Sequence, residues 1–582
     1  MSSFSLENKK DISIVLCGAA GQGIKTVEQF LTQVLFEEGY NVAATKEYMS
    51  RVRGGTNSTE IRVSSTRVSA FVDRIDIFIP LNKTAIARQR RRISEDTIII
   101  GEPEFIENEL DIEKYKIIEI PWTKIAEEIG NRLYSNVIAA GVIAGLFNIN
   151  KELGKDFLRK RFATKGEQVI QNNFNAFMKG IQIADEIIEE KGLKISLEKT
   201  KITNDSQMNK EIIYNGAEMI GLGAIAGGCN FICSYPMSPS TSVLIFLANH
   251  SDDFAILVEQ AEDEIAAINA SIGASYAGAR AFVTTSGGGF ALMGEGLSLS
   301  GIIEAPIVIH IAQRPGPATG LPTRTEQGDL ELALYSGHGD FPRILFAPGT
   351  LEDAFYISQQ AFNLADKFQT PVIILTDQFF MDLYYNFPNL DISNIKIENN
   401  VIETNKSYQR YKLTENGISP RGIPGYGKGL VRADSDEHDE DGFITEDLDL
   451  TRIQMVEKRF KKLEEIKKNV IAPELVGKED FETLVIGWGS TYTAIKEAIE
   501  ELQNKKIAFL HFKQLYPLHP KTTEYLEKAK NRIIIENNAT SQFGKLIRLT
   551  TGIDIEHKIL KFNGMPFSVE ELVEKIRKIV EA

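Results

Sequence analysis

Residues 258–289 read VEQAEDEIAAINASIGASYAGARAFVTTSGGG and contain the end of one strand, a helix and a second strand. The runs FAILVE and RAFVTTS are short, apolar and partly β-branched, which is typical of buried strands. The segment between them is rich in alanine and has little polar face, as expected of a buried helix. A strand–helix–strand unit of this kind predicts an α/β fold with parallel strands.

Acidic residues crowd the start of this helix. Acids near a helix N-terminus offset the positive end of its dipole, so Glu259, Glu262 and Asp263 could be there for stability alone. Glu264 is different, because it stands directly against the apolar run Ile265–Ile268 of a helix that we expect to be buried. A carboxylate at the mouth of a buried helix therefore suggests a function.

The same alternation of strands and helices extends over most of the chain, which predicts three open, mainly parallel α/β domains. Polar, Pro-rich and acidic stretches separate the domains. The expected boundaries are an α/β domain at 1–195, a linker at 196–210, a second α/β domain at 211–393, an extended acidic linker with a charged helix at 394–475, and a third α/β domain at 476–582.

Length and composition fit a multidomain globular protein. The chain has 582 residues, of which 43% are hydrophobic and 25% charged. A net charge of −15 disfavours nucleic-acid binding. Neither a signal-peptide core nor a run of about 18 apolar residues is seen, so we expect no membrane span and a cytoplasmic location.

The cysteine content excludes a disulfide framework. Only Cys17, Cys229 and Cys233 are present, too few for a four-thiolate iron–sulfur cluster built by this chain alone. Cys229 and Cys233 lie in a Gly-rich apolar segment, where buried structural thiols are expected, with a metal or redox role as the alternative.

Three further stretches resemble ligand sites but depart from them. GAAGQGI, residues 18–24, follows a strand and opens a helix, yet its spacing differs from the dinucleotide pattern, so a tight turn or another anion contact is expected. GIPGYGKG, residues 422–429, lacks the Ser or Thr of a phosphate loop. The acidic run at 434–450 lacks the bidentate acid of a calcium loop and is expected to be a solvated loop.

Binding groups gather instead at strand ends of the second domain. In CSYPMSPSTS, two prolines stiffen a loop that presents Ser238, although a simple stiff turn is the alternative. The glycines 287–289 would let a ligand approach the backbone closely. Arg314 and Arg324 follow a later strand, and each could bind a carboxylate or form a surface ion pair.

Several long stretches, in the right order, resemble the α subunit of 2-oxoacid:ferredoxin oxidoreductases. The resemblance rests on YPMSPST, EDEIAAINASIGASYAGARAFVTTSGGGFALM, RPGPATGLPTRTEQGD, DEHDEDGFITED, HFKQLYPLHP and IIIENNATSQFGKLIRL. The N-terminal GAAGQGI and YMSRVRGGTNSTEIRVS are similar to the γ domain of the same family, here fused ahead of α. The match spans nearly the whole chain.

The resemblance implies a transketolase-like architecture and a role for Glu264. Residues 1–195 correspond to the γ domain, 211–393 to the thiamine diphosphate pyrimidine-binding domain, and 476–582 to the transketolase C-terminal-like domain. In EDEIAAI, Glu264 matches the catalytic acid that hydrogen-bonds the aminopyrimidine ring of thiamine diphosphate. The motifs also place Tyr235, Pro236, Gly287 and Gly288 among the residues that contact this cofactor.

Substrate contacts follow from the same motifs. Arg314 matches the arginine that binds the carboxylate of the 2-oxoacid, and Ser238 stands where the family usually has threonine. Thr323 and Arg324 are candidates for the far end of a dicarboxylic 2-oxoacid such as 2-oxoglutarate. Arg51 and Arg53 of the γ domain are possible contacts for coenzyme A, with an exposed hairpin as the alternative.

Two parts of the expected machinery are missing from the sequence. It has no GDG motif with a later asparagine to hold the diphosphate through Mg²⁺, and no set of four cysteines. The resemblance implies a separate β subunit that carries Mg²⁺ and a [4Fe-4S] cluster, in an αβ or (αβ)₂ assembly that reduces ferredoxin. No metal site is expected in this chain itself.

The sequence therefore predicts a subunit of a 2-oxoacid:ferredoxin oxidoreductase. The reaction would be coenzyme A-dependent oxidative decarboxylation of a 2-oxoacid, with 2-oxoglutarate the favoured substrate. One alternative is the same chemistry on pyruvate or on a branched or aromatic 2-oxoacid. The other is a non-catalytic regulatory subunit. Two departures from the family motifs hint at it, namely Ser238 in place of threonine and Gly288 where the family often has proline.

Overall fold

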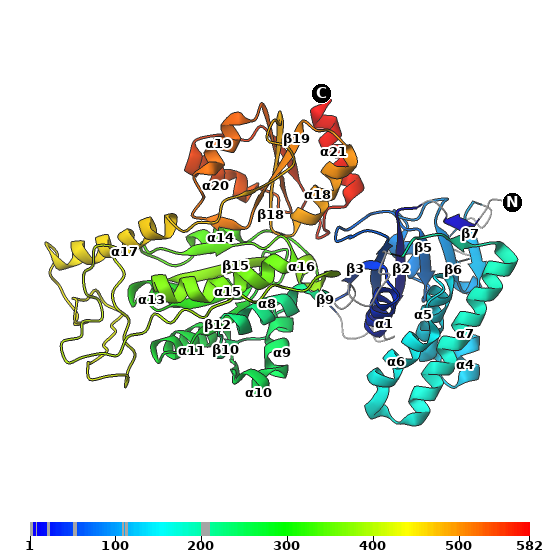
Figure 1. Cartoon of the computed structure of the whole chain (residues 1–582), viewed down its shortest axis with the longest axis horizontal. Helices are drawn as coiled ribbons and strands as arrows, with labels where there is room; N and C mark the ends of the chain where they lie inside the picture. The colour runs from blue at the N-terminus through cyan, green and yellow to red at the C-terminus, as the bar shows by residue number, and fades with distance from the viewer. Residues whose placement is uncertain are drawn as a thin grey trace. The chain divides into compact units, whose positions relative to one another are not determined.

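The computed structural model describes residues 4–6, 9–19, 24–50, 55–106, 110, 114–199 and 210–581. The chain forms two compact units, shown in Figure 1. Unit 1 comprises residues 1–214 and 382–389, and unit 2 comprises residues 215–381 and 390–582.

An eight-stranded mixed sheet forms the centre of unit 1, in the order β7-β6-β5-β2-β4-β3-β16-β9. The pairs β2–β5, β5–β6 and β6–β7 are parallel, whereas β2–β4, β4–β3 and β3–β16 are antiparallel. The bounds are β2 (Asp11–Ala19), β3 (Asn41–Glu47), β4 (Thr56–Ser64), β5 (Ile77–Pro80), β6 (Ile98–Gly101), β7 (Lys116–Glu119), β9 (Glu211–Asn215) and β16 (Tyr384–Pro388); the short β1 (Ser5–Leu6) and β8 (Lys194–Ile195) pair with each other.

Helices cover this sheet and bury its apolar side chains. The helices are α1 (Ile24–Glu37), α2 (Ala85–Gln89), α3 (Pro103–Ile106), α4 (Trp122–Ile129), α5 (Ser135–Leu146), α6 (Lys151–Phe162) and α7 (Glu167–Lys191). The larger core contains side chains of β2, α1, α5 and α7, and a smaller core contains α2 and α3. Helices α5 and α7 pack in close contact at Gly141 and Gly180. The absence of side chains allows this, since a Cβ atom at either glycine would collide with the backbone of the other helix.

A seven-stranded sheet forms the first half of unit 2, in the order β11-β10-β12-β13-β15-β14-β20. All neighbours are parallel except β14 and β20. The bounds are β10 (Phe231–Ser234), β11 (Leu257–Gln260), β12 (Ala281–Thr285), β13 (Ile307–Gln313), β14 (Ile344–Phe346), β15 (Pro371–Asp377) and β20 (Gln514–Tyr516). The chain order reverses between β10 and β12, and open α/β sheets bind ligands at the carboxyl ends of the strands at such a point.

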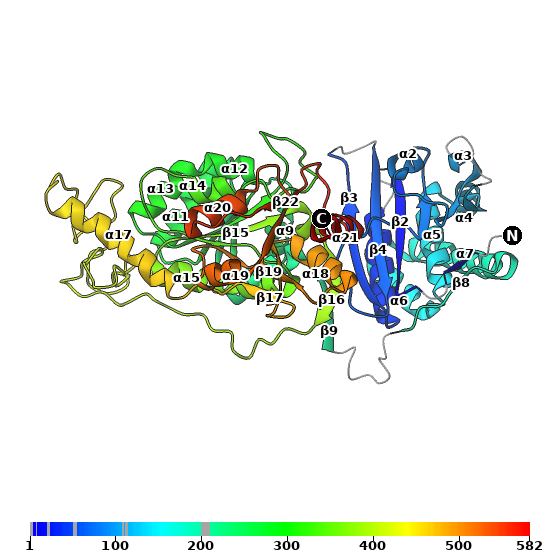
Figure 2. The ribbon, with the colours of Figure 1, turned by 90° about the horizontal axis from the view of Figure 1, so that it is seen from above.

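Helices lie on both faces of this sheet. Figure 2 shows α11 and α13 on one side of β15 and α15 on the other. The helices are α8 (Gly216–Ala226), α9 (Thr241–Asn249), α10 (Ser251–Phe254), α11 (Glu264–Tyr276), α12 (Gly287–Leu292), α13 (Gly294–Ile302), α14 (Leu330–Tyr335), α15 (Leu351–Phe368) and α16 (Gln378–Asp382).

A five-stranded sheet completes unit 2, in the order β17-β19-β18-β21-β22. Its bounds are β17 (Glu474–Val476), β18 (Thr483–Trp488), β19 (Ile507–Phe512), β21 (Asn531–Glu536) and β22 (His557–Leu560), with α18 (Thr491–Leu502), α19 (Lys521–Lys528), α20 (Gln542–Thr551) and α21 (Val569–Val580). In Figure 1, α18 and α21 lie on one side of β18 and β19, and α19 and α20 on the other. Buried residues of both sheets of unit 2 form one continuous hydrophobic cluster.

Residues 390–450 form a long extended segment that leads to α17 (Thr451–Lys467), as Figure 2 shows. Apart from isolated bridges, this segment has no helix or strand. Helix α17, which follows this segment, is anchored to the rest of unit 2 by Glu304. This buried carboxylate pairs with Lys458 and Lys462 of α17. A helix stands where the charged helix was predicted, and the acidic run lies in a segment without helix or strand.

The structure confirms the predicted multidomain α/β class. The expected domain boundaries stay a prediction, and the sequence analysis did not anticipate that β9 and β16 extend the sheet of unit 1. All three cysteines are buried and unpaired, and burial raises the pKa of Cys229 to about 12. Among the described residues, every helix is too short or too polar to cross a membrane.

Candidate functional site

The predicted binding stretches meet at the carboxyl edge of the seven-stranded sheet. The loop 235–240 follows β10, Glu264 begins the helix after β11, the glycines 287–289 follow β12, and Arg314 follows β13. Because the strands are parallel and adjacent, their carboxyl ends lie at one edge. We call this region the crevice.

Glu264 is the first residue of α11, and its carboxyl group is buried. The cap of this helix is Asp263, whose side chain accepts a hydrogen bond of 2.8 Å from the N–H of Ala266. Glu264 is 3% exposed, and its Oε1 atom has no hydrogen-bond partner among the described residues. Burial raises the pKa of Glu264, and Asp263 adds to this effect. Both effects shift the carboxyl group toward its protonated form.

The three glycines after β12 have different roles. A Cβ atom at Gly289 would collide with Oε1 of Glu264 and with Oγ1 of Thr285. At Gly287 it would collide with the carboxyl group of Asp329. At Gly288 it would only touch the carbonyl oxygen of Ala318, at 3.6 Å. The observed position of the Asp329 carboxyl group therefore requires a glycine at 287, and that of the Glu264 carboxyl group requires a glycine at 289.

Arg314 connects two sides of the crevice. Its Nη1 donates a hydrogen bond of 2.6 Å to the carbonyl oxygen of Ser238, while its Nε is buried without a partner among the described residues. Burial lowers the pKa of Arg314, and the carboxylates of Asp329 and Glu264 oppose that shift. The side chains of Tyr235 and Ser238 are exposed in the same loop.

The loop 314–329 carries Thr323 and Arg324 and is held by the C-terminal sheet. Nε2 of Gln327 donates a hydrogen bond of 2.8 Å to the carbonyl oxygen of Trp488. Its Oε1 accepts a hydrogen bond of 3.0 Å from the N–H of Asn537. Thr323 is buried and Arg324 is half-buried, with Gly564 packed close to the stem of Arg324. The loop therefore has a fixed path.

Asp329 is a candidate site residue that the sequence analysis missed. Its Oδ2 atom is buried without a hydrogen-bond partner among the described residues, and burial raises its pKa to about 7. No spacing rule marks this residue, since its importance comes from contact with Gly287, which lies far from it in sequence.

The remaining site predictions have other outcomes. Pro236 lies half-buried in the 235–240 loop, beside Tyr235. Arg51 and Arg53 lie outside the described residues, as does most of the GAAGQGI stretch. GIPGYGKG lies in a segment of turns and bends, without the strand-to-helix turn of a phosphate loop.

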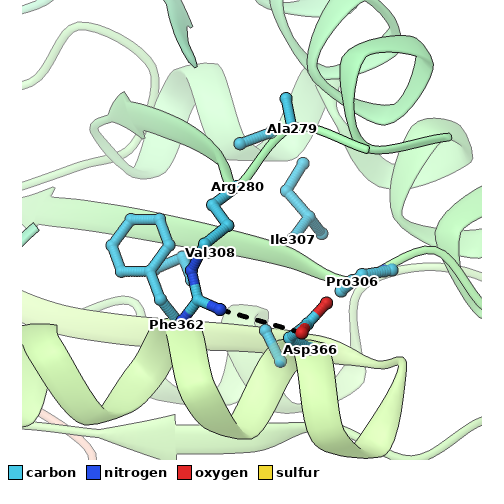
Figure 3. Close-up of a pocket in the computed structure, with 9 residues that line it drawn as sticks. Ala279, Arg280, Pro306, Ile307, Val308, Phe362 and Asp366 are labelled. Carbon is cyan, nitrogen blue, oxygen red and sulfur yellow. Dashed lines mark ion pairs between the residues drawn. The ribbon is translucent and has the colours of Figure 1, made fainter. Parts of the chain in front are cut away.

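A small cavity of about 10 Å³ lies at the opposite, amino-terminal edge of β12 and β13 (Figure 3). Arg280 and Asp366 form an ion pair within it. Arg280 also bonds Asn363 and two backbone carbonyls, and Asp366 pairs with Arg421. A cavity of this size holds about one water molecule. It is a structural junction and is separate from the crevice.

Comparison with known proteins places this architecture in a class of thiamine diphosphate-dependent oxidoreductases. Residues 222–458 match the family model for the thiamine diphosphate-binding part of pyruvate flavodoxin/ferredoxin oxidoreductases, and residues 13–183 match the pyruvate ferredoxin/flavodoxin oxidoreductase model. A 2-oxoacid:ferredoxin oxidoreductase α subunit from Saccharolobus solfataricus is 31% identical, over 98% of each chain. The chain belongs to the 2-oxoacid:ferredoxin oxidoreductase family, as an α subunit.

Two other relatives are informative. A 2-oxoglutarate synthase subunit from Archaeoglobus fulgidus is 34% identical, over 57% of this chain and 89% of its own length. The solved structure of 2-oxoglutarate:ferredoxin oxidoreductase from Magnetococcus marinus, with 2-oxoglutarate, coenzyme A and succinyl-CoA bound, superposes with a TM-score of 0.90. That protein is 31% identical, and the match covers 98% of this chain and 100% of its own.

Proposed function

We propose that this chain builds one half of a thiamine diphosphate site and that a β subunit builds the other half. The complex would convert 2-oxoglutarate and coenzyme A into succinyl-CoA and carbon dioxide and pass two electrons to ferredoxin. The buried carboxyl group of Glu264 carries this proposal, because it lies near the switch point of the sheet and its Oε1 atom has no hydrogen-bond partner among the described residues.

The crevice fits the pyrimidine end of thiamine diphosphate. A buried carboxyl oxygen without a partner is costly unless a ligand supplies one, and the aminopyrimidine ring offers a nitrogen for that hydrogen bond. Gly289 leaves the space in which the Glu264 carboxyl group stands. Thiamine diphosphate supplies the electron sink that loss of carbon dioxide from a 2-oxoacid requires.

Glu264 would share a proton with the ring nitrogen of the pyrimidine. Burial raises the pKa of Glu264 and so shifts the carboxyl group toward its protonated form, which is the form that can donate this proton. Asp263 already caps the helix, so Glu264 is available for the ligand.

Arg314 would bind the 2-oxoacid through its C1 carboxylate. A guanidinium group can donate two parallel hydrogen bonds to a carboxylate, and the bond to the Ser238 carbonyl fixes its orientation. The hydroxyl group of Ser238 would lie beside the substrate. Thr323 and Arg324, on the loop held by Gln327, would bind the distal carboxylate of 2-oxoglutarate.

Exposed apolar side chains on the elements of the crevice support a partner subunit. Ile265, next to Glu264, is 51% exposed, and Tyr235, Leu292 and Leu321 are also exposed. Grouped exposed apolar side chains mark protein–protein interaction sites. The β subunit would cover this surface and bring Mg²⁺, the diphosphate site and a [4Fe-4S] cluster. Arg51 and Arg53 remain candidates for coenzyme A.

The proposal is tested with the αβ complex, produced by co-expression and supplied with thiamine diphosphate and Mg²⁺ without oxygen. Coenzyme A-dependent reduction of a viologen dye is measured with 2-oxoglutarate, pyruvate and branched and aromatic 2-oxoacids. We expect Glu264→Gln to lower turnover by about 10²- to 10⁴-fold and to leave assembly intact.

Glu262→Gln is the matched control, because Glu262 is exposed and two residues away. It should keep full turnover. Normal turnover by the Glu264→Gln complex would exclude Glu264 from the mechanism. If the native complex assembles but none of the tested 2-oxoacids supports dye reduction, a regulatory subunit would be favoured.

A further inference from the structure

Gln327 joins the loop 314–329 to the five-stranded C-terminal sheet, and its side chain is fully buried. Its backbone N–H donates a hydrogen bond of 2.7 Å to the carbonyl oxygen of Asn537. Its own carbonyl oxygen accepts one of 3.1 Å from Nδ2 of Asn538. With the two side-chain bonds to Trp488 and Asn537, the N–H, the carbonyl, Oε1 and Nε2 of Gln327 all bond to residues at the carboxyl ends of β18 and β21.

The groups that hold Gln327 are held in turn by Glu536, a buried carboxylate at the end of β21. Glu536 accepts hydrogen bonds of 3.2 Å from Nε1 of Trp488 and of 2.8 Å from Nδ2 of Asn538. It also accepts a bond of 3.0 Å from each of two backbone N–H groups at the start of α20. A buried polar network whose members are bonded to one another is rigid. The C-terminal sheet therefore offers Gln327 a rigid support.

Two further contacts fix the loop beside Arg324. The N–H of Thr325 donates a hydrogen bond of 3.2 Å to the carbonyl oxygen of Gly564, and its Oγ1 accepts one of 3.2 Å from the N–H of Phe379 in α16. Gly564 also lies against the stem of Arg324, because a Cβ atom at this glycine would stand 3.1 Å from the Cβ atom of Arg324. The backbone that presents Thr323 and Arg324 is therefore held both by the C-terminal sheet and by α16.

We propose that Gln327 is a positioning residue through which the C-terminal sheet sets the choice of 2-oxoacid. This inference rests on the proposed function, in which Thr323 and Arg324 bind the distal carboxylate of 2-oxoglutarate. A mobile loop has to be ordered when the substrate binds, and the entropy lost in that step weakens the contact with the distal carboxylate. Because Gln327 fixes the loop in advance, 2-oxoglutarate gains the full contact, whereas pyruvate has no distal carboxylate and gains nothing.

The test compares the native αβ complex with one that carries Gln327→Met, and measures kcat and KM for 2-oxoglutarate and for pyruvate. Methionine is similar to glutamine in length and volume but cannot form the bonds to Trp488 and Asn537. We expect KM for 2-oxoglutarate to rise by about tenfold, while KM for pyruvate stays within about twofold. A merely structural defect would lower the apparent kcat for both acids and leave the ratio of the two KM values unchanged.

Gln369→Met is the matched control. Gln369 is a second buried glutamine of unit 2 whose side chain makes two hydrogen bonds. Its Nε2 donates 2.6 Å to the carbonyl oxygen of Ser419, and its Oε1 accepts 2.7 Å from Nη1 of Arg410. It lies just before β15, at the amino-terminal edge of the seven-stranded sheet and away from the crevice. This variant should keep the native KM ratio even if it lowers the stability of the complex.

A double variant shows whether Gln327 acts through Arg324. In a complex with Arg324→Gln the distal contact is already lost, so adding Gln327→Met should change KM for 2-oxoglutarate by less than about twofold. If Gln327→Met does not assemble, Gln327→Glu replaces it. Glutamate keeps the shape and the acceptor for Asn537, but its carboxylate cannot donate to Trp488, so we expect a change of the KM ratio in the same direction.

An unchanged KM ratio in the Gln327 variants, or additive effects in the double variant, would overturn the role of Gln327 alone. Absence of turnover by the native complex with every 2-oxoacid would overturn the proposed function as well.

Discussion

At the scale of the residue, the crevice depends on glycines that leave space for the carboxyl groups of neighbouring side chains. The carboxyl groups of Glu264 and Asp329 have room where they stand because Gly289 and Gly287 have no Cβ atoms. None of these glycines has a positive φ, so the requirement is for space and does not concern backbone conformation. Adding a methyl group at Gly289 and at a glycine with open space around it should therefore have very different effects.

We expect Gly289→Ala to displace the Glu264 carboxyl group and to lower turnover strongly, with a loss of about 1–3 kcal/mol of stability. Gly273→Ala is the matched control, since Gly273 lies on the same helix as Glu264 and a Cβ atom there would meet nothing within 4 Å. Thermal unfolding and dye reduction of both αβ complexes check this. Equal activities for the two variants would contradict the steric account.

Arg324 offers a residue-scale test of substrate choice. Arg324→Gln should raise KM for 2-oxoglutarate by about 10- to 100-fold, the loss of one charged hydrogen-bonded contact, while KM for pyruvate stays the same. The ratio of the two KM values is the measurement. A parallel rise for both acids would place Arg324 outside the distal carboxylate site.

Sequence reasoning identified residues of this crevice only where a motif or a strand end marked them. Glu264 was found because an acid stood against an apolar helix, and Arg314 because it followed a strand. Asp329 and the need for Gly289 were missed. Both depend on contacts between distant parts of the chain, and spacing along a sequence does not report such contacts.

At the scale of the element, α17 is joined to the body of unit 2 by a buried cluster of charges. Lys458 lies 2.6 and 2.8 Å from the two carboxylate oxygens of Glu304, and Lys462 pairs with the same group. The two lysines hold the pKa of Glu304 well below its usual range. The carboxylate therefore stabilises the folded state above the pKa it has when unfolded, and this contribution is lost as the pH falls into the acid range.

Glu304→Gln should destabilise unit 2 by about 3–5 kcal/mol at neutral pH, because two buried ammonium groups lose their counter-charge. Chemical denaturation followed by fluorescence measures the change. Glu295→Gln is the control, since that carboxylate is exposed and pairs with the exposed His338. A similar small effect for both substitutions would show that the buried cluster does not hold α17.

The element assignments show what periodicity can predict. The strands and helices of the crevice follow their hydrophobic patterns, and the charged helix at α17 was foreseen. Strand β16 was not, because the run that contains it gives no sign that it pairs with β3 far away in sequence. Pairing of distant strands is settled by tertiary packing, which local patterns do not report.

At the scale of the whole molecule, the N-terminal region is more than an appended domain. Strand β16 comes from the middle of the chain, yet it completes the sheet of unit 1, where Tyr385 and Phe387 are buried. Asn386 accepts a hydrogen bond of 2.9 Å from the N–H of Val42 and donates one of 2.9 Å to the side chain of Asn41.

Removal of residues 1–210 should therefore expose Tyr385 and Phe387 and leave β9 and β16 as an isolated strand pair, which is marginally stable in water. We expect the truncated chain to aggregate in size-exclusion chromatography. The same truncation with Tyr385→Ser and Phe387→Ser should remain dispersed. A dispersed truncated chain without these substitutions would contradict the integral role of β16.

The central claim is that Glu264 binds the pyrimidine of thiamine diphosphate in a site shared with another subunit. The most direct measurement is an experimental structure of the αβ complex with thiamine diphosphate bound. We expect a carboxyl oxygen of Glu264 at about 2.6–3.2 Å from a nitrogen of the pyrimidine ring, with the diphosphate held by the β subunit. Thiamine diphosphate bound away from the carboxyl ends of β10 and β12, with Glu264 still unpartnered, would contradict the account.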